Sequence, residues 1–230
     1  MEVKNKIYLN DVLLIRPIII LLLLVHHIFG YNAFSAHPIP KGVHIVPFYS
    51  WISSIPYSFF LEMFVFVSGY IFAFQIFAKN KNFSIKTLTI SKFNRLIIPS
   101  IVFSILWLVI FQSPGLQFGS IESFSIKCVY YIFNGCGHMW FLPMLFWCFI
   151  FSFLLLKLKI DERLKLIGLL GLSIISFAIP PIFQISKACY YLLFFYGAIY
   201  IERERKGFQK IDKTNSYDCM LDIIFTVVFI

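Results

Sequence analysis

A few ionisable side chains interrupt the long apolar stretches of this sequence, and their types are those that move protons or hold anions. Arg16 and His27 lie in the first stretch, Glu62 in the second, Arg95 at the start of the third and His138 at the start of the fourth. A neutral imidazole is able to take a proton from a hydroxyl group, and a nearby carboxylate orients the ring or stabilises its cation. A guanidinium group binds phosphate through charge-assisted hydrogen bonds. These residue types therefore indicate transfer chemistry at a hydroxyl group, provided that the fold brings them together.

The elements that must position these groups are helices that cross a membrane. Hydrophobic residues make up 60% of the sequence and charged residues only 13%, which is far from the composition of a soluble domain. A helix needs about 20 apolar residues to cross roughly 30 Å of hydrocarbon, and it satisfies its own backbone groups there. The apolar stretches predict six spans, at 12–30, 57–77, 96–112, 139–156, 165–183 and 188–201, and a partial seventh at 220–230. We therefore expect an all-α, polytopic transmembrane helix bundle, with residues 1–230 forming one membrane-embedded domain.

The distribution of Lys and Arg predicts the orientation of the bundle. All but three of the 20 Lys and Arg residues lie on the side of the N-terminus, the exceptions being Lys41, Lys127 and Lys187. Because cytoplasmic loops carry the excess of basic residues, the N-terminus is predicted to be cytoplasmic, in a multi-pass protein of the inner (plasma) membrane. The formal net charge of +9 follows from this bias and from attraction to anionic lipid, so it does not indicate a nucleic-acid partner.

This topology sorts the polar residues into two layers. His27 follows Arg16 by eleven residues, which places it roughly 16 Å closer to the outer side and within about 20° of the same helix face. His26 points about 100° away from that face. The outer layer is predicted to hold His27, Glu62, His138 and Trp140, and the inner layer Arg16, Lys92 and Arg95. A charge near the centre of a bilayer costs about 2.5–3.5 kcal/mol, so these residues are candidates for function.

Most of these side chains also have a structural interpretation. Arg16 and Arg95 also have an explanation as anchors that reach to lipid phosphates on the cytoplasmic side, and for Arg95 alone the anchor is the commoner role. His138 and Trp140 are residue types that are common in the belt at a membrane–water interface. Glu62 is harder to explain in this way, because a carboxylate among apolar residues needs a partner.

The five cysteines form a scattered set whose spacing indicates no metal site. Cys128 and Cys136 share a predicted outer loop and could form a disulfide in an oxidising compartment. We therefore predict no bound metal.

Four short motifs that contain these residues follow one another along the chain. They are "RPIIILLLLVHH" with Arg16 and His27, "EMFVFVSGY" with Glu62, Ser68 and Gly69, "KFNRLIIPSI" with Arg95, and "HMWFLPMLF" with His138 and Trp140. Taken in this order, over about residues 8–200, they resemble the membrane acyltransferase family 3. Members of that family are O-acyltransferases that modify cell-surface and secreted glycans.

The resemblance implies an activity and a role for each motif. The implied activity is transfer of an acyl group, usually acetyl, from cytoplasmic acyl-CoA to a hydroxyl of a carbohydrate acceptor on the far side of the bilayer. The implied roles fall into three groups: His27, Glu62 and His138 as catalytic residues, Arg16, Lys92 and Arg95 as residues that bind the CoA phosphates, and Trp140 and Ser68 as residues that bind the acceptor. His27 is the residue expected to take the hydroxyl proton, with His138 as a second base or a hydrogen-bond donor.

The end of the chain gives a further expectation. Members of this family usually have about ten spans, whereas the final apolar run, "MLDIIFTVVFI", is too short to cross a membrane. The sequence therefore predicts a relative that is truncated at its C-terminus. Two other interpretations stay open: a transporter or flippase fragment in which Glu62 and the histidines relay protons, and an inactive homologue. The acyl group, the acceptor glycan and the oligomeric state are open as well.

Overall fold

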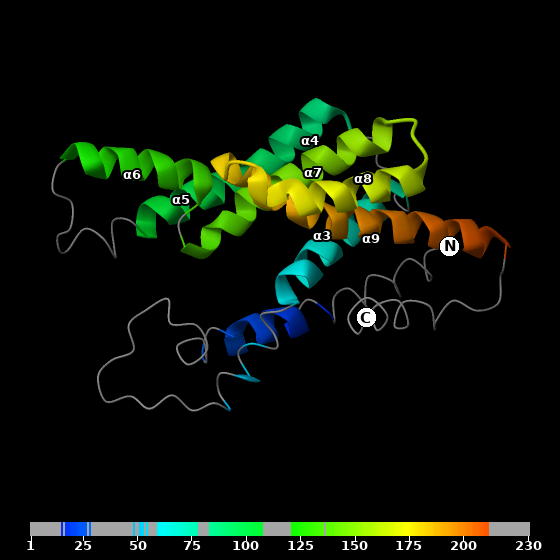
Figure 1. Cartoon of the computed structure of the whole chain (residues 1–230), viewed down its shortest axis with the longest axis horizontal. Coiled ribbons are helices and arrows are strands. Elements are labelled where there is room, and N and C mark those ends of the chain that lie inside the picture. Colours follow the sequence, from blue (N-terminus) through cyan, green and yellow to red (C-terminus); the bar gives the residue numbers. More distant parts are fainter. Residues whose placement is uncertain are drawn as a thin grey trace. The chain divides into compact units, whose positions relative to one another are not determined.

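The computed structural model describes residues 15, 17–26, 28, 48, 51, 52 and 54, and the ranges 59–77, 83–107, 121–135 and 137–211. The description omits the side chains of residues 121–125, 127–128, 137–138 and 205–211. Helix makes up 92% of the described residues, and no strand occurs among them (Figure 1). The predicted all-α class is therefore confirmed.

Three helices in the described ranges are long and apolar enough to cross a membrane. They are Phe60–Phe77, Ile85–Trp107 and Ile182–Glu204, and they overlap the second, third and sixth predicted spans. Two shorter apolar helices, Pro17–His26 and Phe141–Lys157, overlap the first and fourth predicted spans. Together these helices indicate a membrane protein.

The structure differs from the fifth predicted span, 165–183. Helix α8 (Glu162–Ile175) has 14 residues, or about 21 Å of helix, which is short for roughly 30 Å of hydrocarbon. It begins after Asp161, whose carboxylate accepts a hydrogen bond from the Arg163 amide at 3.2 Å. The apolar run then breaks into two 3-10 turns, η5 (Ser176–Ala178) and η6 (Ile182–Gln184). Prolines at positions 180 and 181 explain the break, because proline lacks the N–H group that a helix interior needs.

The chain divides into two compact units, each of which is described by itself. The first unit comprises residues 1–78 and 198–230. Its described part contains the helix Pro17–His26, α3 (Phe60–Phe77) and the end of α9 (Ile185–Ile211). Its buried cluster consists of Ile19, Phe60, Val67, Tyr70 and Ala198. Apolar residues on every side of α3 are typical of a helix surrounded by other helices and lipid.

The second unit, residues 79–197, starts with one continuous helix in three parts: α4 (Ile85–Lys92), the π-helical turn η1 (Phe93–Ile97) and α5 (Ile98–Trp107). A capping box starts α4, because the Ser84 hydroxyl accepts from the Thr87 amide and the Thr87 hydroxyl accepts from the Ser84 amide, each at 3.1 Å. Pro99 explains the wider turn that precedes it. Its ring would clash with the carbonyl group of Arg95 in a regular α-helix, and it has no N–H to donate there.

Helix α7 (Phe141–Lys157) runs antiparallel to this long helix and packs against it. The Phe146 ring lies 6.4 Å from the Phe93 ring, centroid to centroid, and joins a buried cluster with Ile97 and Ile150. Further along, the buried Ser100 hydroxyl donates to the carbonyl oxygen of Met139, just before α7, at 3.4 Å. Increasing residue numbers on one helix therefore face decreasing numbers on the other.

Helix α6 (Ile121–Asn134) occupies a segment that the sequence analysis assigned to an outer loop. It packs beside α5 (Figure 1). Ile126, Val129 and Phe133 are exposed and recur at helical spacing, so they form one apolar stripe on α6. The segment is not a predicted span because polar residues such as Glu122 and Ser125 lower its hydropathy.

Candidate active site

Helix α3 carries the second motif. Glu62 lies in its first turn and is half-buried, and no basic side chain in the described ranges forms an ion pair with it. A carboxylate in this turn is favoured by the positive end of the helix dipole. Ser68 lies about 120° away around the helix, and its hydroxyl donates to the Phe64 carbonyl at 2.8 Å. Glu62 and Ser68 therefore do not share a helix face.

The two residues of the first motif, Arg16 and His27, lie outside the described residues. The histidine that the structure places is His26, which is half-buried, with its ring centroid 5.7 Å from that of Phe60. Phe60 opens α3, two residues before Glu62. The first helix therefore brings an imidazole to the end of α3 that carries the carboxylate. Sequence reasoning set His26 aside because it lies about 100° from the face of Arg16.

The basic motif lies in α4 and η1, and its two cations differ in their surroundings. The Lys92 ammonium nitrogen lies 3.5 Å from the centroid of the Phe149 ring on α7, which is a cation–π contact. Arg95 sits in the π turn and is exposed. Lys92 therefore contacts α7, whereas the Arg95 side chain is exposed.

The His-Met-Trp motif forms a tight turn whose backbone is fixed from two sides. The turn is η4 (Gly137–Trp140), a 3-10 turn that leads into α7. Gly135 precedes it with φ at 75°, and a Cβ atom there would lie 2.6 Å from the backbone carbon of Met139 and the backbone nitrogen of Trp140. Only glycine fits such a close approach. On the other side, Ser100 binds the Met139 carbonyl. The backbone of His138 is therefore held in place, although its side chain lies outside the description.

The indole ring of Trp140 packs against α9. The Lys187 ammonium nitrogen lies 3.7 Å from the indole centroid, and the Tyr191 ring lies 6.3 Å away, centroid to centroid. Lys187 and Tyr191 are one turn apart, so they share a face of α9. Trp140 is thus engaged within the fold and is not simply an interfacial anchor.

The structure brings the basic motif closer to the His-Met-Trp turn than the two predicted layers allow. Ser100, which contacts Met139, follows Arg95 by only five residues, or about 7.5 Å along the helix axis. Arg95 and the turn that contains His138 are therefore close in depth. The sequence analysis started the third span at residue 96 and so placed Arg95 at its boundary. In the structure the helix starts at Ile85, and Arg95 lies well inside it.

The geometry of the site does not by itself show which protein family the chain belongs to, but a comparison with known families does. The sequence model of the acyltransferase domain of acyltransferase family 3 matches residues 9–216, a range that includes all four motifs. The chain belongs to the acyltransferase 3 family. It is therefore an acyltransferase, and the resemblance seen in the motifs is confirmed. Searches of curated proteins and of solved structures each gave no match.

The acyltransferase also has an open pocket of about 480 Å³ between α6 and η6. Its lining is almost wholly apolar, from Val129, Tyr130, Phe133, Asn134, Pro181, Ile182 and Phe183. The polar groups of Asn134 are already used, since its side-chain oxygen accepts from the Phe183 amide at 3.0 Å and its NH₂ group donates to the Tyr130 carbonyl at 3.1 Å. The pocket therefore offers few of the hydrogen bonds that a sugar ring needs.

Backbone strain borders this pocket in the acyltransferase. Phe183 and Gln184 have φ values of 56° and 58°, in the left-handed region that non-glycine residues rarely adopt. Trp147 donates from its indole nitrogen to the Phe183 carbonyl at 3.1 Å, and the side-chain NH₂ group of Gln184 donates to the main-chain carbonyl of Asn134 at 2.8 Å. These bonds hold the strained pair in position.

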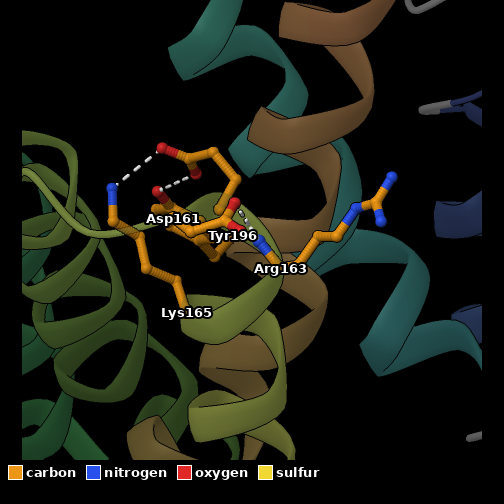
Figure 2. Close-up of polar contacts among 5 residues, drawn as sticks. Asp161, Arg163, Lys165 and Tyr196 are labelled. Carbon is orange, nitrogen blue, oxygen red and sulfur yellow. Dashed lines mark hydrogen bonds and ion pairs between the residues drawn. The ribbon is translucent and has the colours of Figure 1, made fainter.

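A carboxylate at the start of α8 joins this helix to α9 (Figure 2). Glu162 accepts hydrogen bonds from the Lys165 ammonium group and from the Tyr196 hydroxyl, each at 2.8 Å. Lys165 and Tyr196 are buried, whereas Arg163 points away from the cluster and is exposed. Because the carboxylate is balanced inside the fold, this cluster stabilises the packing of the two helices and does not serve as a free acid or base.

No group of three His, Cys, Asp or Glu side chains in the described ranges is arranged to hold a metal ion. Cys148 and Cys189 are buried and free. The pairing of Cys128 with Cys136 lies outside the described side chains and stays a prediction.

Proposed function

We propose that this acyltransferase transfers an acetyl group from cytoplasmic acetyl-CoA to a hydroxyl of a cell-surface carbohydrate. It acts as one membrane-embedded, multi-pass domain in the inner membrane, with a cytoplasmic N-terminus. The observation that carries the proposal is the family match, because residues 9–216 include all four motifs in order. The excess of Lys and Arg on the side of the N-terminus supports the orientation.

The reaction needs a base, because a sugar hydroxyl is too weakly acidic to attack a thioester unaided. The acceptor oxygen forms a bond with the thioester carbonyl carbon, the C–S bond breaks, and the hydroxyl proton ends on the thiol of CoA. His27 takes this proton, which contributes about 10²–10⁴-fold, and Glu62 stabilises the imidazolium ion that results. His138 serves as a second base or donates a hydrogen bond to the acceptor.

The donor is held by Arg16, Lys92 and Arg95 through the phosphates of CoA. Support is strongest for Arg95, because it is exposed, whereas Lys92 already contacts the Phe149 ring. The small difference in depth between Arg95 and the His-Met-Trp turn supports a single site, with the phosphates near Arg95 and the thioester towards the turn.

The acceptor is bound by Trp140 and Ser68. The indole offers a face on which a sugar ring can stack. The Ser68 hydroxyl donates its proton within α3, so it meets the acceptor as a hydrogen-bond acceptor only.

Transfer of radiolabelled acetyl from acetyl-CoA to the carbohydrate fraction of membranes that contain the protein tests the proposal. We expect labelled carbohydrate with the wild type and none with His27→Ala. Arg95→Ala should raise the KM for acetyl-CoA more than it lowers kcat. Lys159→Ala, which removes an exposed cation from the segment after α7, is the matched control and should leave both constants unchanged. Label that enters only lipid or protein would reject the carbohydrate acceptor, and a folded wild type that transfers no label would reject acetyl-CoA as the donor.

A further inference from the structure

Lys187 places its ammonium group where a positive charge is unfavourable. It is half-buried in the candidate span Ile182–Glu204 and lies in the first turn of α9, at the positive end of the helix dipole. In the described part of the chain no carboxylate forms an ion pair with it. A half-buried cation without an acidic partner calls for a specific compensating contact.

That compensation comes from the indole of Trp140. Its ring centroid lies 3.7 Å from the Lys187 ammonium nitrogen, and tryptophan is the aromatic residue that binds cations best. Tyr191, one turn along α9, contacts the same indole. Two neighbouring side chains of α9 thus fix the last residue of the turn that contains His138.

The contact of Lys187 with Trp140 differs from a second cation–π contact, which is made by Lys157. Lys157, at the C-terminal end of α7, also lies near an aromatic ring, 4.7 Å from the centroid of Phe153. Lys157 is exposed and stands at the negative end of its helix dipole, where a cation is favourable. Its contact with Phe153 therefore needs no further explanation.

We infer that Lys187 is a positioning residue for acyl transfer: its charge fixes the Trp140 indole and, through the η4 turn, the place of His138. This inference rests on the proposed function, because it takes His138 and Trp140 as parts of the acceptor site. A positioning role requires the charge at this position. Arginine should therefore replace lysine, because a guanidinium group also binds the face of an indole, and a neutral side chain should not.

The test compares Lys187→Met and Lys187→Arg with the matched control Lys157→Met in the acetyl-transfer assay. We expect Lys187→Met to lower kcat at least 10-fold with little change in the KM for acetyl-CoA, and Lys187→Arg to restore most of the loss. Lys157→Met should have wild-type kinetics. Tryptophan fluorescence should shift in Lys187→Met but not in Lys157→Met, because only the first removes a cation from an indole. Equal kcat for Lys187→Met and wild type would overturn the inference.

A double substitution separates action through Trp140 from direct action on the substrate. In a Trp140→Leu background, Lys187→Met should cause no further loss of kcat if the charge acts through the indole. A full additional loss would overturn the positioning role. Wild-type protein that transfers no acetyl would reject the proposed function and this inference with it, whereas the fluorescence shift would still report the contact between Lys187 and Trp140.

Discussion

Gly135 controls the turn that contains His138. Its φ of 75° costs a non-glycine residue about 1–2 kcal/mol, and the added Cβ would also press on backbone atoms that cannot rotate away. We expect Gly135→Ala to lower the unfolding temperature in detergent and to reduce acetyl transfer at least as strongly as the loss of Trp140. Thermal unfolding and the transfer assay measure the two effects.

Gly168→Ala is the control for this change. Gly168 lies within α8, and a Cβ atom there would have nothing within 4 Å. Alanine should stabilise this helix by up to about 1 kcal/mol. If Gly135→Ala were as stable as Gly168→Ala, the turn would not require glycine at position 135.

At Glu62, a single substitution can remove the charge of the side chain while its shape is kept. Glu62→Gln keeps the shape but removes the carboxylate that we propose stabilises the imidazolium ion. We expect normal membrane insertion and a fall in kcat of about 10²-fold or more. Glu204→Gln, at an exposed position of α9, should be indistinguishable from wild type. Full activity in Glu62→Gln would mean that the carboxylate serves only the first turn of α3.

Residue type alone was enough to select some of these side chains. Glu62, Arg95 and His138 are conspicuous because ionisable groups are rare within apolar runs. Gly135, Ser100 and Lys187 were not selected, because each is ordinary in its local sequence. Ser100 and Lys187 matter because of contacts with Met139 and Trp140 that form only when distant segments meet. Gly135 matters because of its left-handed backbone conformation, which residue type alone does not reveal.

Among the elements, the π turn η1 is the one that sets the direction of Arg95. Pro99→Ala would supply the missing N–H group and permit a regular α-helix. We expect the unfolding temperature to stay equal or rise, and the KM for acetyl-CoA to rise several-fold because Arg95 is rotated relative to α7. Thermal unfolding and steady-state kinetics would test this pair of effects. A raised unfolding temperature with an unchanged KM would show that the π turn has no part in donor binding.

The packing of α8 on α9 depends on the Glu162 carboxylate. Tyr196→Phe removes the hydrogen bond from the Tyr196 hydroxyl to this carboxylate, and bonds to charged groups contribute about 1.5–3 kcal/mol. We expect Tyr196→Phe to lower the unfolding temperature. At temperatures where the variant is still folded, acetyl transfer should be retained. Tyr200→Phe changes the same helix at a hydroxyl that makes no hydrogen bond to a described residue, so it should have a smaller effect. Equal losses of stability in the two variants would contradict a stabilising role for the hydrogen bond between Tyr196 and Glu162.

Hydropathy predicted the helices that are apolar throughout and missed those that are not. The span 57–77 agrees closely with α3, because apolar residues predominate along the whole of α3. Residues 85–92 were left out of the third span because of Lys86, Thr87 and Lys92, although Ser84 is a residue type that often caps the start of a helix. The length of α8 was overestimated because η5 and η6 continue its apolar composition after the helix itself has ended.

At the scale of the whole molecule, the orientation in the membrane is the property that follows most directly from the sequence. With the N-terminus in the cytoplasm, fusions of a fluorescent protein after residues 80, 160 or 212 should fluoresce. Fusions of alkaline phosphatase after residues 45 or 115 should be active outside. The reverse pattern would refute the orientation, and it would place the proposed CoA-binding residues on the wrong side of the membrane for a cytoplasmic donor.

The bonds between Asn134 and the η6 turn have a consequence for how the protein is made. Asn134 is buried, and its side-chain oxygen and main-chain carbonyl are paired with Phe183 and Gln184, about fifty positions later in synthesis. While the ribosome is still adding α7 and α8, these groups have no native partner. The end of α6 therefore acquires its final structure only after residue 184 has left the ribosome, and until then these polar groups bond to water or to other transient partners.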